Sequence, residues 1–445
     1  MTALAKAKSG STLVLRGGTY RESARVPFKK KLVIQSYPGE AVWLDGSVPV
    51  TGWQKSGATW FVSGWNHNFD SRVSYSSSND QSDWFVDPKF PMAGHPDQVW
   101  IGGQRLAEVG SAAAVKPGTF FVDTAAKRLV VGSDPTGKQV QASVLQKALQ
   151  IQGEGTIVRG IGVRRYATTL HMMGAVTTEV DDISMENVVI TENATIGLGG
   201  WNARQRFRKL TITGNGLMGF GYSGAPGLVL EQSIISGNNV EHFNPAPVAG
   251  GVKITRTTGV TVRANLVENN INSSGIWLDE SVKNATVVGN TVRGNDSTGI
   301  SAEISDQIVI ADNHVIANRG TGIWSYTSSN VDIWNNTLVA NSRTLAVWQD
   351  DRDTSTAHYR NGLPWLSKNI NIHNNVFSYG TNFCPVLTQD LRQKWTGNDF
   401  GITMNGNAYH RPSPKNPERF ACWANGKKGT ESFPTLTAFR NATGQ

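Results

Sequence analysis

The chain has 445 residues, of which 17% are charged and 39% are hydrophobic, and 47 of them are glycine. This composition excludes a disordered chain and is typical of a turn-rich β protein with a large core. No run of 18 apolar residues occurs, so we expect no membrane-spanning helix. The net charge of +8, from 42 basic and 34 acidic residues, is scattered. It indicates a solvated surface or attraction to an anionic glycan; no nucleic-acid-binding motif is present.

Residues 1–47 are expected to form a cap and the first coils of a β solenoid. The opening residues TALAKAKSGSTLVLRGGTYRES combine the end of an amphipathic helix with a first strand. Such a cap shields the open end of a solenoid from edge pairing. Because the capping segment is short, we expect that a signal peptide has been removed and that the protein is secreted or held at the cell surface.

Residues 48–145 interrupt the solenoid pattern. They include QVWIGGQRLAEV and GTFFVDTAAKRLVVGSDPTG, in which alternating apolar residues are bounded by Gly and Asp-Pro turns. This alternation predicts a small antiparallel, β-sandwich-like module inserted into the solenoid. We expect either a module that reaches over the functional face or a structural pad without a catalytic role.

Residues 146–445 are predicted to form the main body of the fold, with an irregular C-terminal segment. Between Asn265 and Asn341 one unit recurs four times, and its anchors Gly275, Gly299, Gly322 and Thr344 are 24, 23 and 22 residues apart. This period, with short β-branched runs and Asn at the turns, predicts an all-β, right-handed parallel β-helix.

The coil period also predicts which side chains stack on one another. Equivalent residues of successive coils lie about 4.8 Å apart, and side chains alternate between the two faces of each strand. We therefore expect a core formed by Ile276, Leu278, Ile300, Ala302, Ile304 and Ile323. The outward strip is expected to contain Trp277, Asp279, Ser281, Ser301, Glu303, Ser305, Trp324, Tyr326, Ser328, Trp348 and Asp350.

Two carboxylates occupy the same position of adjacent coils in this strip. Asp279 and Glu303 each lie four residues after an anchor, so their carboxyl groups are expected about 5 Å apart, which is the separation that retaining glycosidases use. Two carboxylates this close do not both ionise easily. Lys253, diagonally below Asp279, favours the ionised form of that residue. We therefore predict that Asp279 is the nucleophile and Glu303 the acid/base.

Further side chains are predicted to bind substrate. Trp277 and Tyr326 flank the carboxylates and offer faces for sugar rings. Trp324 and Trp348 form an aromatic ladder that either binds sugar or only stabilises the stacked coils. The remaining candidates are Lys253, Asp350, Trp201 on an earlier coil, and His242 in the overhanging loop VEHFNPAPVAG.

Other features carry weaker predictions. The turn residues Asn265, Asn290, Asn313 and Asn336 are expected to hydrogen-bond the next coil. Cys384 and Cys422 are close to the C-terminal end, and the sequence leaves open whether they form a disulfide. We expect a carbohydrate substrate, no metal and no organic cofactor. The oligomeric state stays open, a homo-oligomer included.

Three alternatives compete with a hydrolase. The two carboxylates either lie side by side without a function or bind a cation such as calcium. A polysaccharide lyase or uronate epimerase on the same fold would use Lys253, His242 or Tyr326 as a base that removes the proton α to a carboxylate. A glycan-binding β-helix would bind sugar without turnover.

The stretch GIWLDESVKNATVVGNTVRGNDSTGISAEIS resembles the catalytic stretch of the β-helical β-xylosidases of glycoside hydrolase family 120. The segments QVWIGGQRL and PGTFFVDTAAKRLVVG are similar to the β-sandwich that those enzymes insert in the helix. The resemblance implies that Asp279 is the nucleophile and Glu303 the acid/base. Glu280 stands where those enzymes tend to have an aromatic residue, so the sugar and its linkage stay open.

Overall fold

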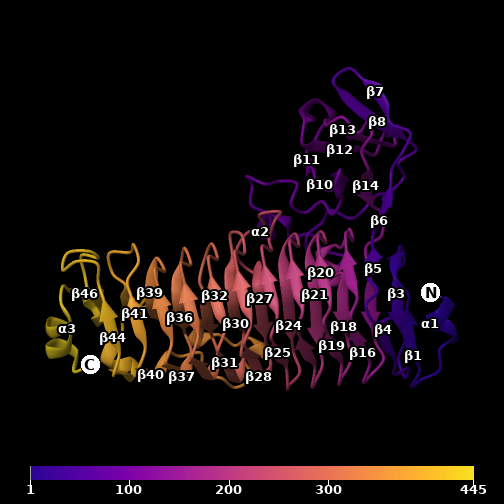
Figure 1. Cartoon of the computed structure of the whole chain (residues 1–445). Helices are drawn as coiled ribbons and strands as arrows, with labels where there is room; N and C mark the ends of the chain where they lie inside the picture. The colour runs from indigo at the N-terminus through magenta and orange to yellow at the C-terminus, as the bar shows by residue number, and fades with distance from the viewer. Residues whose placement is uncertain (1) are drawn as a thin grey trace.

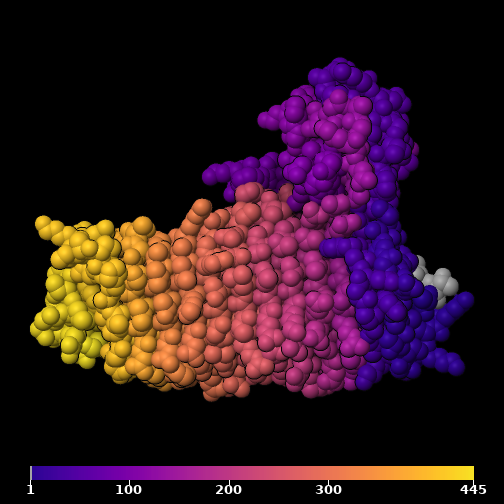
Figure 2. Space-filling model, viewed as in Figure 1, coloured from indigo at the N-terminus to yellow at the C-terminus, as the bar shows by residue number. Residues whose placement is uncertain are grey.

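The computed structural model describes residues 2–445; Met1, the first residue of the predicted cap, lies outside them. Stacked β coils form a rod, with the two ends of the chain at opposite ends of the rod (Figure 1). A separate module rises from the side of the rod near its N-terminal end (Figure 2). No helix among the described residues is long and apolar enough to cross a membrane.

Three long sheets run along the rod, and each is named here by its first strand. The β1 sheet contains β1 (Thr12–Leu15), β4 (Val33–Ser36), β16 (Ile157–Arg159), β19 (Ser184–Glu186), β22 (Arg206–Arg208), β25 (Val229–Glu231), β28 (Thr258–Arg263), β31 (Lys283–Val288), β34 (Asp306–Ala311), β37 (Ser329–Trp334), β40 (Lys368–His373) and β43 (Ile402–Asn405). The β2 sheet contains β2 (Gly18–Tyr20), β5 (Val42–Asp45), β17 (Gly162–Arg164), β20 (Val189–Thr191), β23 (Thr211–Thr213), β26 (Ile234–Ser236), β29 (Leu266–Glu268), β32 (Thr291–Arg293), β35 (His314–Ile316), β38 (Thr337–Val339), β41 (Val376–Ser378) and β44 (Ala408–His410).

The β3 sheet is the one that bears the predicted strip. It contains β3 (Ala24–Val26), β15 (Leu149–Ile151), β18 (Val176–Thr178), β21 (Ile196–Trp201), β24 (Met218–Ser223), β27 (Gly250–Thr255), β30 (Ser274–Asp279), β33 (Ile300–Glu303), β36 (Thr321–Tyr326), β39 (Arg343–Gln349), β42 (Val386–Asp390), β45 (Ala421–Ala424) and β46 (Thr430–Phe433). Neighbouring strands pair in parallel, except that β46 pairs antiparallel with β45. The chain is therefore a parallel β-helix.

One apolar core fills the inside of the rod. It runs from Val26 in the first coil to Phe439 near the C-terminal end, and it includes Ile276, Leu278 and Ile300, which are all 0% exposed. Strands of the β1 and β2 sheets, such as β31 and β38, bury alternate residues, whereas β21 and β27 of the β3 sheet are buried along almost their whole length. Each coil contacts only the coils next to it. Burial of apolar surface between neighbouring coils is therefore the main stabilisation of a solenoid.

Two ladders of asparagines, all buried except Asn407, fix the register of the coils. In each ladder the side-chain amide of one Asn donates to the side-chain oxygen of the Asn one coil further on, as for Asn290 and Asn313 at 3.0 Å. The first ladder contains Asn265, Asn290, Asn313, Asn336, Asn375 and Asn407. The second contains Asn193, Asn215, Asn238, Asn270, Asn295, Asn318 and Asn341.

The anchor glycines are required by close packing beside the second ladder. A Cβ added at Gly275 would lie 2.7 Å from the carbonyl oxygen of Gly299 and 2.9 Å from the amide of Asn295. Any side chain would therefore push adjacent coils apart. The repeated glycine of the sequence marks the corner at which the chain enters the β3 sheet.

The corner at which strands leave the β3 sheet differs from the predicted alternation. Ile304 has a φ of 39°, in the left-handed region, and this turns its side chain away from the rod core. It packs instead with Leu363 and Trp365 in a separate cluster. Ser305 and Ser328, which were expected to face solvent, are buried and donate to the carbonyls of Glu303 and Ala302. Simple alternation fails here because the strand ends before these residues.

Residues between β5 and β15 form two small sheets outside the rod. One contains β6 (Ser47–Pro49), β9 (Val99–Ile101), β10 (Gln104–Arg105) and β14 (Val140–Ser143). The other contains β7 (Gln54–Ser56), β8 (Thr59–Ser63), β11 (Ala107–Glu108), β12 (Thr119–Asp123) and β13 (Arg128–Val131). All their pairings are antiparallel except that of β11 with β12. They share a core of their own.

An arm of this module packs on the rod. The arm includes α2 (Ser82–Phe85), and Figure 1 shows α2 beside the coil of β27. Phe85 and Val73 are buried against Phe243 and Val248 of the loop that precedes β27. Asn244 ties that loop to the arm, because its side-chain amide donates to the carbonyl of Trp84 at 2.8 Å.

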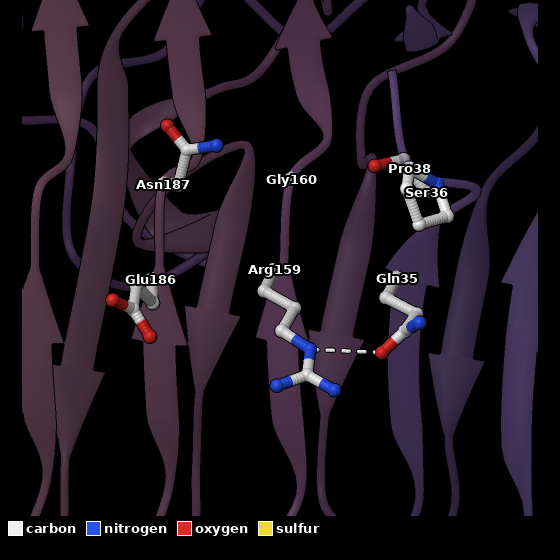
Figure 3. A pocket seen from close by; sticks show the side chains of 7 residues that line it. All are labelled: Gln35, Ser36, Pro38, Arg159, Gly160, Glu186 and Asn187. Carbon is white, nitrogen blue, oxygen red and sulfur yellow. Dashed lines mark hydrogen bonds between the residues drawn. The ribbon is translucent and has the colours of Figure 1, made fainter. Parts of the chain in front are cut away.

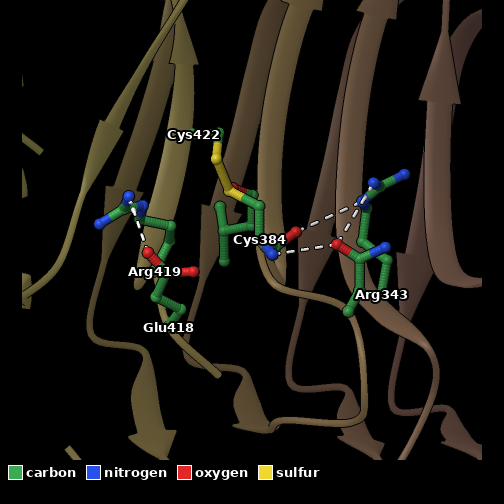
Figure 4. The surroundings of a disulfide bond; sticks show 7 residues. Arg343, Cys384, Glu418, Arg419 and Cys422 are labelled. Carbon is green, nitrogen blue, oxygen red and sulfur yellow. Dashed lines mark hydrogen bonds and ion pairs between the residues drawn. A yellow bond between two sulfur atoms is a disulfide. The ribbon is translucent and has the colours of Figure 1, made fainter. Parts of the chain in front are cut away.

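The two ends of the rod are covered differently. At the start, Leu4 of α1 (Thr2–Lys6) packs against the core. At the end, β46 and α3 (Leu436–Thr443) close the last coil, and Phe439 of α3 is buried. Cys384 and Cys422 form a disulfide that joins the segment before β42 to β45 (Figure 4).

The asparagine ladder gives a direct test of coil registration. Replacing Asn313 by Ala removes the acceptor for the backbone N–H and side chain of Asn290, and the donor to the carbonyl of Val287. Because these buried groups lose their partners, we expect Asn313→Ala to lower the free energy of unfolding by about 3 kcal/mol. Chemical unfolding followed by circular dichroism measures this. The exposed Asn68→Ala control is expected to change it by less than about 0.5 kcal/mol, and equal effects of the two substitutions would contradict the role of the ladder.

Candidate active site

Strand register places Asp279 and Glu303 at matching positions of adjacent coils. β30 and β33 pair Leu278 with Ala302, so the next residue of each strand is an acidic one. Leu278 and Ala302 are in the core, and therefore the two carboxylates lie on the outer face of the β3 sheet. This is the register that the coil period predicts.

Asp279 is held by two charge-assisted contacts. Its Oδ2 accepts from Nζ of Lys253 at 2.8 Å, and its Oδ1 accepts from the backbone N–H of Glu280 at 2.7 Å. The side chains of Lys253 and Asp279 are 10% and 9% exposed. Because both side chains are almost fully buried from water, the salt bridge and the N–H donor stabilise the negative charge of the Asp279 carboxylate strongly.

Glu303 has a different environment. Its Oε1 accepts from Nη1 of Arg352 at 2.7 Å and its Oε2 accepts from Nε1 of Trp277 at 2.9 Å. Burial, followed by the negative charge of Asp279, raises the pKa of Glu303 to about 7, and Arg352 only partly opposes this rise. A carboxyl group with this pKa can exchange a proton near neutral pH.

The charges around the pair agree with the raised pKa of Glu303. Arg352 also binds Asp350, with 2.7 Å between Nε and Oδ2. The cluster therefore contains two cations, Lys253 and Arg352, and three carboxyl groups, Asp279, Asp350 and Glu303. It is neutral when Glu303 is protonated and carries one negative charge when Glu303 is ionised.

Sequence reasoning missed Arg352. The residue lies in η3 (Arg352–Thr354), within the long connection between β39 and β40 that also contains η4 (His358–Arg360). This loop folds back toward earlier coils, so the coil period cannot place its side chains. The only signal in the sequence is that Arg352 follows Asp350, a member of the outward strip, by two residues.

The faces of Trp277 and Tyr326 are partly covered by cations. Nζ of Lys253 lies 3.6 Å from the centroid of one ring of Trp277, and the guanidinium carbon of Arg352 lies 4.5 Å from that of Tyr326. Tyr326 also stacks on Trp324, with 4.7 Å between centroids. These rings orient the charged residues of the site, and their contact with sugar rings stays a prediction.

Trp324 and Trp348 form a packed wall on the C-terminal side of the pair. Their rings meet edge to face with 4.9 Å between centroids. Both pack against a buried cluster that contains Ala346, Leu387 and the disulfide between Cys384 and Cys422. This packing stabilises the stacked coils, and sugar binding by the two rings stays a prediction.

The other predicted residues lie in several places. His242 stacks on Phe90 of the inserted module, with 4.2 Å between centroids. Asp350 is 9% exposed, and its carboxylate accepts hydrogen bonds from Arg352 and Thr327. Trp201 lines a cavity on the N-terminal side of the pair.

This cavity has a volume of about 530 Å³ and adjoins the Lys253–Asp279 ion pair. Its lining comes from the β3 sheet, the loop before β27, the arm of the inserted module and the loop after β39. A different hollow, of about 330 Å³, lies on the β1 sheet, where Arg159 donates to Gln35 (Figure 3). That hollow is on another side of the rod from the carboxylates.

No group of three or more His, Cys, Asp and Glu side chains within residues 2–445 is arranged to hold a metal ion. Asp279 and Glu303 instead contact Lys253 and Arg352. Their charges are met by the protein's own cations.

Comparison with known proteins agrees with the fold. Residues 173–342 match the family model of the right-handed β-helix region. The structure of XylC with xylose superposes with a TM-score of 0.68 at 14% identity, covering 92% of this chain and 79% of that one. The chain is thus a right-handed parallel β-helix, and its fold is that of XylC.

Two further solved structures match with lower TM-scores. A glycoside hydrolase matches with a TM-score of 0.41 and 12% identity, covering 90% of this chain and 89% of its own. The A-module of the mannuronan C-5 epimerase AlgE4 from Azotobacter vinelandii matches with 0.40 and 16%, covering 60% and 80%. No curated protein matches the chain.

The raised pKa of Glu303 predicts how stability depends on pH. Between about pH 4.5 and 7 the folded protein keeps a proton that the unfolded chain has released. Stability therefore falls as the pH rises through this window, and Glu303→Gln, which cannot ionise, removes that fall. We expect wild type to lose on the order of 2 kcal/mol of unfolding free energy relative to Glu303→Gln between pH 5 and 8.

Urea unfolding at a series of pH values measures this difference. Glu154→Gln, at an exposed glutamate, is the control and is expected to follow wild type at every pH. A constant difference between wild type and Glu303→Gln would contradict a raised pKa for Glu303.

Proposed function

We propose that the chain is a glycoside hydrolase that cleaves its substrate with retention of configuration. The observation that carries this proposal is the unequal environment of two carboxyl groups on adjacent coils: Asp279 is bound to Lys253, while Glu303 has a pKa of about 7. Adjacent coils separate the two residues by about 4.8 Å, close to the spacing used for double displacement. Asp279 can thus act as the nucleophile while Glu303 carries the proton that the leaving group needs.

The proposed reaction has two steps. In the first, Asp279 attacks the anomeric carbon and forms a glycosyl ester, while Glu303 gives its proton to the departing glycosidic oxygen. In the second, the Glu303 carboxylate takes a proton from water, whose oxygen attacks the same carbon and releases Asp279. Arg352 and Trp277 hold the Glu303 side chain in place during both steps.

The nearby cations favour hydrolysis over the lyase or epimerase alternative. Removal of a proton α to a substrate carboxylate needs a positive group that can neutralise this carboxylate. Lys253 and Arg352, the cations next to the pair, each already bind a protein carboxylate at 2.8 Å or less. Because Lys253 and Arg352 are already paired with protein carboxylates, the site favours a neutral sugar at the bond that is cleaved.

We also propose that the protein acts outside the cytoplasm, on an oligosaccharide or polysaccharide. The disulfide between Cys384 and Cys422 supports this location, because such bonds persist in oxidising compartments. The sugar is proposed to be a β-xyloside or a related glycan.

Substitution of the two carboxylates tests the assignment. We expect Asp279→Ala to lose at least about a thousandfold in kcat on aryl glycosides, because no group replaces the nucleophile. Azide is expected to restore turnover of Asp279→Ala with an inverted glycosyl azide product. Glu303→Gln is expected to lose about 10² to 10⁴-fold, because the proton donor is gone.

A panel of 4-nitrophenyl glycosides, with product configuration followed by proton NMR, measures these effects. The matched control is Glu268→Gln, which removes another glutamate paired with an arginine, Arg293, on the β2 sheet. Equal turnover by wild type, Asp279→Ala and Glu303→Gln would overturn the proposal. Products that absorb in the ultraviolet through a new double bond would establish a lyase instead.

The pH profile gives a second test. Because Glu303 must be protonated to cleave the substrate, we expect kcat/KM to fall as the pH rises through about 7. Initial rates on an oligosaccharide with a poor leaving group measure this decrease in kcat/KM. A flat profile between about pH 6 and 9 would contradict Glu303 as the proton donor.

A further inference from the structure

Side-chain size changes abruptly along the β3 sheet on the two sides of the carboxylate pair. On the C-terminal side, the outward positions of the next coils hold Trp324, Tyr326 and Trp348, which pack on one another. On the N-terminal side, the column that leads to Asp279 reads Ser223 and Thr255, with Trp201 beyond them. The parallel column that leads to Lys253 reads Gly199 and Gly221.

Small residues in these columns leave the cavity of about 530 Å³ open above the sheet. Its floor is lined by Gly199, Gly221, Ser223 and Thr255, and Trp201 stands at the coil farthest from Asp279. Three coils separate Trp201 from Asp279, or about 14 Å. One coil advances by about 4.8 Å, close to the length of one sugar in an extended pyranose chain.

Aromatic residues from distant parts of the sequence form the sides of the cavity. Tyr75 and Trp84, from the arm of the inserted module, are 44% and 53% exposed. Tyr359, from the loop after β39, lines the cavity with Arg256 packed over its ring at 4.5 Å. The exposed rings of Tyr75 and Trp84 offer apolar faces on which sugar rings pack, whereas one face of Tyr359 is covered by Arg256.

The charges on the cavity wall cancel in pairs. Among the residues that line it, Lys253 binds Asp279 at 2.8 Å, and Arg256 binds Glu280, with 2.7 Å between Nη2 and Oε2. A uronate or sulfate in the cavity would therefore meet no cation that is free of an internal partner. The wall favours a neutral ligand.

We infer that this cavity binds the part of a neutral oligosaccharide that extends from the cleaved bond toward Trp201, over about three sugar units. The inference rests on the proposed hydrolase and adds its substrate class: a neutral, extended pyranose chain. The packed wall of Trp324 and Trp348 closes the other direction along the sheet. Affinity is therefore set mainly on the Trp201 side of the pair.

Binding to a variant whose hydrolysis is strongly slowed tests the inference apart from turnover. In the Glu303→Gln background, isothermal titration calorimetry is carried out with xylose- and glucose-based β-1,4 oligosaccharides of one to five units and with trigalacturonate. For either the xylose-based or the glucose-based oligosaccharides, we expect the affinity to rise at least tenfold from one to three sugar units and then to level off. Trigalacturonate is expected to bind at least tenfold more weakly than the neutral trisaccharide.

Two substitutions locate the binding. Adding Trp201→Ala or Trp84→Ala is expected to weaken trisaccharide binding at least tenfold, and Trp201→Phe to restore most of it. The control Trp334→Ala removes a tryptophan that stacks on His373 on the β1 sheet, and it is expected to leave binding unchanged. Because Trp84 is largely exposed on the arm, its substitution does not depend on refolding of the rod.

The outcomes separate the inference from the proposed function. If wild type hydrolyses aryl glycosides but binding neither grows with chain length nor depends on Trp201 and Trp84, the inference is wrong while the hydrolase stands. If binding rises with chain length and depends on both tryptophans but wild type cleaves no glycoside, oligosaccharide binding in the cavity is supported and the proposed hydrolase is wrong. Tighter binding of trigalacturonate than of the neutral trisaccharides would overturn the neutral substrate class.

Discussion

The stacking of one coil directly on the next is the constraint on which this molecule depends. Two asparagine ladders and the anchor glycines allow a single register between coils, because a shift would leave buried amides without partners and would force backbone atoms together. Register in turn decides which side chains become neighbours on the outer face of the β3 sheet. Residues 24 apart in the sequence, Asp279 and Glu303, thereby lie side by side.

The two acidic residues differ because their surroundings differ. Asp279 has a buried salt bridge and a backbone N–H, which stabilise its charge. Glu303 is held by an arginine shared with Asp350 and by an indole, and burial beside Asp279 raises its pKa. A rigid sheet fixes both groups in advance, so the proposed reaction would need little rearrangement of the protein.

Much of this arrangement follows from the sequence, for a specific reason. A repeat of fixed period converts positions into spatial neighbours, so the pairing of Asp279 with Glu303 and the contact of Lys253 with Asp279 follow from counting residues. The same counting fails where the chain leaves the sheets. Ile304 adopts a left-handed conformation that no periodicity marks, and Arg352 reaches the site from a loop of irregular path.

The aromatic residues show a second limit of sequence reasoning. Alternation places Trp277, Tyr326, Trp324 and Trp348 on the outer face, but it does not tell whether their rings are free. The cations and the disulfide cluster that cover them come from other coils and loops. The open surface lies instead on the N-terminal side, where the inserted module and the loop after β39 add Tyr75, Trp84 and Tyr359 to a floor of small residues.

Trapping the glycosyl-enzyme tests the central claim most directly. An aryl 2-deoxy-2-fluoro glycoside forms the ester with the nucleophile but slows its hydrolysis, and peptide mass spectrometry then locates the modified residue. The account predicts one label per chain, on Asp279. A label on any other residue, or steady turnover of aryl glycosides with inverted products and no label, would contradict it.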